Sequence, residues 1–357
     1  MKTLTVGVVA LALALLAGCA PTPGPGPGSA PTESPSPTAT LASGPVAALP
    51  LTCAQLFTTG AVQSHLHDTI STKVDETHLG SDLFDLAILQ AGGTECGWGG
   101  QNGTDGAYDT GLVVKILPDA ATEFAARPLP TDGSLVSGTI GSSSSYTCPD
   151  GGGTDWCNGD VLAGNYWISF QLGDANGAEG SGDSTVEAIL RPMADAIAKA
   201  GGSVAPWAEP AKPFDGTALC SASTAPALVS TALEGLETVG DAYELDGLPA
   251  VAEKRGGMTR CQWSSGEVGS DLYVQVLPGG SWLFPRLTAS LPSWVLIGDL
   301  GSLDVPGSDG AFGGCGEHCE SLVDVGSSLV TLDMGNVTDQ PTATAITQRL
   351  IAGVAAG

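Results

Sequence analysis

The tripeptide Cys96-Gly97-Trp98 and its counterpart Cys261-Gln262-Trp263 decide the fold that we expect for this chain. Each lies between a segment that ends in glycine and a run that closes in Leu-Pro, at Pro118 or at Pro278. Aligning the two cysteines superimposes identical residues in the preceding segments: Leu83 on Leu248, Ala87 on Ala252, Gly92 on Gly257 and Thr94 on Thr259. We therefore interpret the chain as a tandem duplication, and each property inferred for one half is tested against the other.

The two copies are expected to span residues 47–201 and 213–357, with a Pro- and Ala-rich linker at residues 202–212. Each copy has the size of an ordinary domain and carries four cysteines of its own. We therefore expect each copy to fold alone, with Trp207 of the linker as a residue able to pin the copies together.

The pattern of apolar residues predicts the same elements in both copies. Alternation predicts strands at residues 112–117 and 272–277, and further strands follow before the end of each copy, at residues 166–172 and 328–334. Short helices are expected at residues 54–63 and 224–233, and an i, i+3, i+4 stripe predicts a closing helix in each copy. The predicted fold class is α+β: two homologous, disulfide-stapled domains, each an antiparallel sheet packed with about two helices.

Composition and charge limit the partners. The chain has 38 acidic and 12 basic residues, and its formal net charge is −26. Such a polyanion repels nucleic acid and anionic headgroups, so we expect no nucleic-acid partner. Solubility is the favoured reason for the acidity, and a cation or a basic partner is the alternative.

The N-terminus carries a targeting pattern. Lys2 precedes an apolar run at residues 6–16, and Leu16-Ala17-Gly18-Cys19 closes the segment. This pattern resembles the lipobox of bacterial lipoproteins. The resemblance implies that residues 1–18 are a removed signal peptide and that Cys19 carries the lipid, with acyl chains such as palmitate. An ordinary signal peptide or a membrane-spanning helix is the alternative, but the run is short for a span of about 20 residues.

Residues 19–46 are rich in Pro, Gly, Ser and Thr, with Glu33 as the only charge. Such a segment cannot bury enough apolar surface to order itself, and its prolines keep it extended. We expect a lipidated tether that spaces the folded part from the membrane.

Eight cysteines remain when Cys19 is set aside, four in each copy at nearly equal spacings. In an exported chain an even number predicts disulfides, although four cysteines allow three pairings per copy. The pairings that we favour are Cys53–Cys96, Cys148–Cys157, Cys220–Cys261 and Cys315–Cys319. Metal or redox chemistry around His318, between the last two cysteines, is the alternative, but the first copy has no histidine there.

Trp98 and Trp263 occupy the matched position two residues after a cysteine. In a strand both side chains then lie on the same face, so a tryptophan packed over a disulfide in the core is expected. A platform that stacks a ligand is the alternative.

Other polar clusters carry weaker signals. His65, His67 and His78 lie among acidic residues, and a solvated loop is favoured over a zinc or copper site because the second copy lacks these histidines. Two Gly-rich runs suggest turns rather than a calcium site, because neither has the EF-hand spacing. Their oxygen-bearing residues are Asn102, Asp105, Asp109, Asp150, Asp155, Asn158 and Asp160. The serine-hydrolase, Walker and dinucleotide motifs do not occur, so we predict no catalytic residue, no metal and no cofactor.

The Cys-x-Trp layout on a lipidated domain with two cysteine pairs resembles the small envelope lipoproteins of Gram-positive bacteria, a resemblance that implies no established activity. We therefore expect a lipoprotein on the extracytoplasmic face of the cell membrane. Its expected role is non-enzymatic binding of an envelope protein or a small ligand. A secreted hydrolase or metal-dependent enzyme acting on cell-wall polymer is the alternative.

Overall fold

The computed structural model describes residues 44–65, 74–75, 83–100, 110–128, 136–148, 157–173, 182–204, 207, 214, 216–219, 238–240, 246–264, 272–289, 301–335 and 337–355. The signal segment, most of the tether, the helix expected at residues 224–233, His67 and His78 lie outside these residues.

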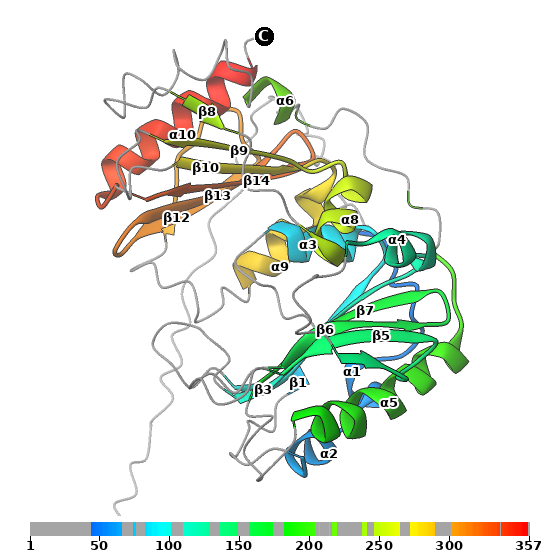
Figure 1. Cartoon of the computed structure of the whole chain (residues 1–357). Helices are drawn as coiled ribbons and strands as arrows, with labels where there is room; N and C mark the ends of the chain where they lie inside the picture. The colour runs from blue at the N-terminus through cyan, green and yellow to red at the C-terminus, as the bar shows by residue number, and fades with distance from the viewer. Residues whose placement is uncertain are drawn as a thin grey trace, which may run out of the picture. The chain divides into compact units, whose positions relative to one another are not determined.

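Two seven-stranded antiparallel sheets carry the fold (Figure 1). The first has the order β1-β2-β3-β7-β6-β5-β4 and consists of β1 (Val74–Asp75), β2 (Thr94–Gly100), β3 (Thr110–Leu117), β4 (Val136–Gly138), β5 (Ser143–Thr147), β6 (Cys157–Ala163) and β7 (Tyr166–Gly173). The second consists of β8 (Thr238–Gly240), β9 (Thr259–Ser264), β10 (Leu272–Leu277), β11 (Gly301–Ser302), β12 (Gly310–Cys315), β13 (Cys319–Val325) and β14 (Ser328–Met334). Its order is β8-β9-β10-β14-β13-β12-β11. When the seven strands of each half are matched in chain order, this arrangement is the same as that of the first sheet. The strands expected at residues 112–117, 166–172, 272–277 and 328–334 are therefore confirmed, and each is central in its sheet.

Tight turns set the register of these sheets. Gly326 and Ser327 join β13 to β14, and their φ angles are 52° and 64°. Two consecutive positive φ values define the type I′ turn, whose twist matches that of the paired strands. The turn thereby places each β13 side chain opposite a fixed partner on β14.

The described helices are short except at the end of each half. They are α1 (Cys53–Leu56), α2 (Thr59–Gln63), α3 (Leu83–Gln90), α4 (Ala121–Ala126), α5 (Gly182–Ala200), α6 (Gly216–Leu219), α8 (Gly247–Gly256), the 3-10 helix η1 (Gly280–Leu283), α9 (Phe284–Ala289) and α10 (Gln340–Ala355). The expected closing helices are confirmed as α5 and α10.

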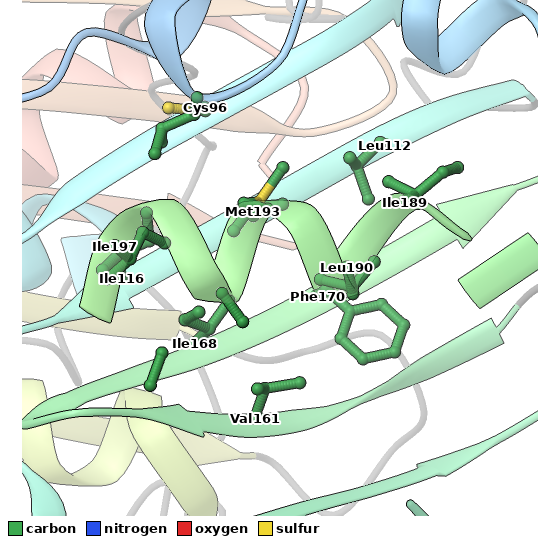
Figure 2. Close-up of a cluster of buried hydrophobic side chains, with 14 of the residues drawn as sticks. Cys96, Leu112, Ile116, Val161, Ile168, Phe170, Ile189, Leu190, Met193 and Ile197 are labelled. Atoms are coloured by element: carbon green, nitrogen blue, oxygen red, sulfur yellow. The ribbon is translucent and has the colours of Figure 1, made fainter. Parts of the chain in front are cut away.

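The long helix of each half covers one face of its sheet, which we call the outer face. Figure 2 shows Ile197 of α5 beside Ile116 of β3 at one end of the helix, and Ile189 of α5 beside Leu112 of β3 at the other. In the second half, Ile346 and the neighbouring apolar side chains of α10 pack on the second sheet in the same way. Each sheet thus has a core of its own on its outer face.

The helix expected at residues 54–63 is broken in two. Phe57 is extended, with φ −156° and ψ 142°, and Thr58 caps the next helix through its side chain. The break leaves the Phe57 carbonyl oxygen free of helical bonding, and it accepts a hydrogen bond of 2.9 Å from Nε1 of Trp98. A tertiary contact to the matched tryptophan therefore outweighs continuation of the helix.

The described disulfides agree with the pairings that we favour. Cys53–Cys96 joins α1 to β2, Cys148–Cys157 closes the segment before β6, and Cys315–Cys319 bridges the hairpin of β12 and β13. Cys261 is also disulfide-bonded, and its expected partner Cys220 lies outside the described residues.

A third core is shared by the two halves. Helices α3 and α8 contact each other, and their buried residues Ala87 and Ala252 belong to one cluster. This cluster also takes Trp167 from β7 and Leu283 from η1, and Trp207 packs against it. Leu41–Gly357 consequently form one compact unit.

The polar contacts between the halves repeat the same arrangement twice. Nε2 of Gln90, at the end of α3, donates a hydrogen bond to the carbonyl oxygen of Pro278, just beyond β10. Arg255, near the end of α8, donates one of 2.7 Å to the carbonyl oxygen of Pro118, just beyond β3. Aligning Cys96 with Cys261 makes Gln90 and Arg255 equivalent. Each half therefore makes the same kind of contact to the other, as the two subunits of a two-fold symmetric dimer do.

Candidate functional site

The face of each sheet that α5 or α10 does not cover is called its inner face. The candidate site lies on these inner faces. At one end these faces contribute to the shared core, through Trp167 on the first sheet and Leu277 and Leu329 on the second. Further along the strands the inward-facing residues become polar. Because side chains alternate between the two faces, the register of the strands lines these residues up in rows.

The first sheet carries a charged row across five strands. The residues paired in register are Glu95, Lys115, Ser169, Asp160 and Ser145, on β2, β3, β7, β6 and β5. Lys115 forms an ion pair with Asp85 of α3, and Glu95 is fully buried beside it in the sheet. A buried carboxylate next to a cationic partner is tolerated where a lone one is not.

Asp160 anchors the segment after α4 to this row. Its Oδ1 accepts a 2.7 Å hydrogen bond from Nε1 of Trp167, and its Oδ2 lies 3.7 Å from Nε of Arg127. Arg127 also donates to Ser145 and stacks over the ring of Phe124 at 3.4 Å. Both carboxylate oxygens thus have partners within the protein.

Burial is the largest influence on the pKa values of Asp160 and Arg127. It raises the pKa of Asp160, although the hydrogen bond from Trp167 and the charge of Arg127 both oppose the rise. Burial also lowers the pKa of Arg127, against the attraction of Asp160. A raised carboxyl pKa is typical of general acids, but the occupied oxygens make this carboxylate a structural tie between α4 and the sheet.

The second sheet brings together His318, Glu320 and Asp333. Glu320 of β13 lies directly opposite Asp333 of β14, and His318 lies two residues before Glu320, in the turn between the disulfide-bonded cysteines. Nε2 of His318 is 3.1 Å from Oε1 of Glu320 and 3.7 Å from Oδ1 of Asp333. The three side chains are between 33% and 45% exposed, although Oδ1 of Asp333 itself is buried.

Tyr273 and Gln262 continue the same row on β10 and β9. Gln262 donates a 2.7 Å hydrogen bond to the Tyr273 hydroxyl. The row therefore ends in groups that can donate and accept hydrogen bonds beside the two carboxylates.

Asp324, also on β13, has an unusual protonation equilibrium. Its Oδ1 is buried and has no hydrogen-bond partner among the described residues. Burial, with the nearby charge of Asp309, raises the pKa of Asp324 to about 6 from 3.8. Since the folded protein holds this proton more tightly than the unfolded chain, the contribution of Asp324 to stability is lost as the pH rises from about 4 to about 6.

We expect Asp324→Asn to stabilise the protein above pH 6 and to have little effect below pH 4. The shift corresponds to at most about 3 kcal/mol, and solvent screening of this half-buried group reduces the expected gain to about 1–2 kcal/mol. Urea unfolding at pH 4 and pH 7.5 measures it. The exposed Asp195→Asn on α5 is the matched control and should change stability little at either pH. An equal effect of Asp324→Asn at both pH values would contradict this assignment.

The structure places the residues singled out in the sequence as follows. Trp98 and Trp263 are 0% and 1% exposed, which confirms the core position and excludes stacking of a ligand on either ring. Asn158 and Asp160, which we assigned to a loop, lie on β6 instead, because the register of the sheet extends through them. His65 is exposed after α2, while His67, His78 and the other residues of the Gly-rich runs lie outside the described residues.

Sequence reasoning missed Glu320 and Asp333 altogether. The available signal was weak: Asp333 lies in the strand predicted at residues 328–334, whereas no strand was predicted at Glu320, and His318 drew notice only for its place between two cysteines. Recognising the cluster requires the register of β13 and β14, which the sequence does not give.

Comparison with protein-family models, with curated proteins and with solved structures finds no match for the chain. Within the described ranges, no helix has both the length and the apolar character needed to cross a membrane.

Proposed function

We propose that this protein is a lipid-anchored binding protein on the extracytoplasmic face of the cell membrane, and that it is not an enzyme. The observation that carries the proposal is Leu16-Ala17-Gly18-Cys19 after an apolar run, followed by a proline-rich tether. Disulfides in both halves support it, since they persist in oxidising compartments outside the cytoplasm.

We further propose that the folded part arose by duplication of one domain. The equal strand order of the two sheets and the equivalent contacts of Gln90 and Arg255 support this origin. Two identical domains that once paired through α3 and α8 would give this interface when fused, because a two-fold contact uses the same surface of both partners.

The inner face of the second sheet is the proposed binding surface. Its polar row is partly exposed, whereas the row of the first sheet is buried or paired within the protein and the outer faces are filled by α5 and α10. An envelope protein or a small polar ligand fits such surfaces, because carboxylates, amides and a tyrosine hydroxyl all offer directional hydrogen bonds.

Replacing Cys19 with Ser should release the protein from membranes. Each buried CH₂ of an acyl chain contributes about 0.8 kcal/mol, so loss of the chains removes essentially all membrane affinity. The measurement is the share of protein in the membrane fraction of cells that express either form. Ser29→Ala in the tether is the matched control and should stay in the membrane. Equal retention of the Cys19→Ser form would refute the lipid anchor.

A further inference from the structure

We propose that His318, Glu320 and Asp333 form a binding site for one divalent transition-metal ion, with zinc as the best-fitting ion. The inference does not depend on the lipid anchor or on the proposed binding function. Neither the histidine cluster near His65 nor the Gly-rich runs contribute to it.

The separations of the ligand atoms fit a metal ion. One candidate ligand atom from each of the three side chains lies within 4.8 Å of the other two. Ligands at about 2.0–2.2 Å from zinc lie roughly 3 to 3.5 Å from one another when they occupy neighbouring corners of its coordination sphere. The distances from Nε2 of His318, 3.1 Å to Glu320 and 3.7 Å to Asp333, are close to that range, so small side-chain movements complete the geometry.

The backbone holds these side chains in place before a ligand binds. Glu320 and Asp333 are register partners on neighbouring strands, and the Cys315–Cys319 disulfide closes the turn that carries His318. The amide of Gly316 also donates a 2.8 Å hydrogen bond to the carbonyl oxygen of His318 within this turn. A site on paired strands loses little conformational entropy when it binds, which favours affinity.

The fold itself does not require carboxylates at these positions. The equivalent register pair of the first sheet is Asn158 and Gln171, two neutral amides beside the Cys148–Cys157 disulfide. Two carboxylates directly opposite each other on neighbouring strands destabilise a sheet through charge repulsion. A bound cation removes that cost, and it explains why the second half carries acidic groups where the first does not.

The donor set selects the class of ion. An imidazole nitrogen with two carboxylates suits zinc and similar divalent transition metals, whereas calcium and magnesium prefer oxygen ligands alone. Three protein ligands leave at least one coordination position for water or for a ligand group. The second-half inner face would then bind anionic ligand groups through the metal, despite the acidity of the chain.

The test is zinc titration of the detergent-solubilised full chain by calorimetry, under non-reducing conditions, so that the cysteines stay in disulfides. We expect one zinc ion per chain at this site, and at least tenfold weaker binding for His318→Ala, Glu320→Gln and Asp333→Asn. Without metal, the midpoint of thermal unfolding should be nearly unchanged in His318→Ala and slightly raised in Glu320→Gln and Asp333→Asn, because either of these two changes relieves the repulsion between the paired carboxylates. Added zinc should raise the midpoint of the wild type only, and chelation should reverse the rise.

The double variant His65→Ala/His67→Ala is the matched control, and it should bind zinc as the wild type does. Loss of binding in this control, with retention in His318→Ala, would place the zinc elsewhere and overturn the proposal. The absence of zinc binding by the wild type would overturn it as well. Calcium binding that survives His318→Ala would indicate an oxygen-only site and contradict the assigned class of ion.

Discussion

Fragments of residues 46–202 and 211–357, each with its disulfides formed, should not unfold cooperatively alone, and they should regain a cooperative transition when mixed. This expectation replaces the one drawn from the sequence, in which each copy folds alone. The reason is the third core, to which both halves contribute and which neither can complete without the other.

The expected effect is large because the side chains at this interface are bulky and almost fully buried. Leu83 and Leu86 of α3 are at most 2% exposed, as are Trp167 and Leu283. Burying one such side chain contributes about 1.5–3 kcal/mol. Exposing several of them in each fragment removes a free energy comparable to the total stability of about 5–15 kcal/mol of an ordinary domain.

Circular dichroism on heating measures the cooperativity, and sedimentation of the mixed fragments measures their association. The matched control is the full chain cut by a protease within an engineered site at residues 208–213. The cut protein should remain associated and should unfold near the midpoint of the intact chain. If each fragment alone unfolds cooperatively near that midpoint, the shared core is not required and the copies are independent domains.

Much of this fold follows from local sequence patterns. The strands β3, β7, β10 and β14 alternate apolar and polar residues or form short apolar runs, and they are found where the sequence places them. The disulfides Cys148–Cys157 and Cys315–Cys319 also follow from spacing, because close cysteines are easily joined. These features depend on residues that lie near one another in the sequence.

The shared core could not be predicted in the same way. Helix α3 has the sequence LFDLAILQ, in which apolar residues occur on nearly every side, so it shows no stripe with a helical period. It is apolar around its circumference because the first sheet lies on one side of it and α8 with β10 on the other. The identity of Ala87 and Ala252 was visible in the alignment, but the contact between the two helices was not.

The candidate metal site was hidden for a different reason. Its ligands come from a turn and two strands, and each residue type is common at the surface of an acidic chain. Only the pairing of Glu320 with Asp333 brings the carboxylates together. The raised pKa of Asp324 is similarly invisible in sequence, because it arises from burial and from the charge of Asp309.

Replacing Asp160 with Ala should destabilise the protein by about 2–4 kcal/mol, whereas Asp160→Asn should cost less because it keeps an acceptor for Trp167. The side chain of Arg127 is only 9% exposed, and removing its carboxylate partner leaves a cation that is largely desolvated. Breaking a buried pair in this way costs about 3–5 kcal/mol, and the 25% exposure of Asp160 reduces the expected loss.

The raised pKa of Asp160 explains why the amide should be tolerated. It means that the folded protein disfavours the charged carboxylate relative to water, so the charge itself is not a net source of stability. An asparagine oxygen can still accept the hydrogen bond from Trp167, which alanine leaves as a buried donor without an acceptor. The side chain of Asp160 therefore matters because it accepts the hydrogen bond from Trp167 and packs beside the buried guanidinium group of Arg127.

A double-mutant cycle with Arg127→Met separates the two contributions, with urea unfolding at pH 7.5 as the measurement. In the Arg127→Met background, Asp160→Ala should cost less than in the wild type, because no buried cation is then left unpaired. The part of the cost that remains reports the hydrogen bond to Trp167. Glu187→Ala, which removes the partner of Arg191 in an exposed i, i+4 ion pair on α5, is the matched control. It should change stability by about 0.5 kcal/mol or less. An equal cost of Asp160→Ala in both backgrounds would show that Arg127 and Asp160 do not act as a pair.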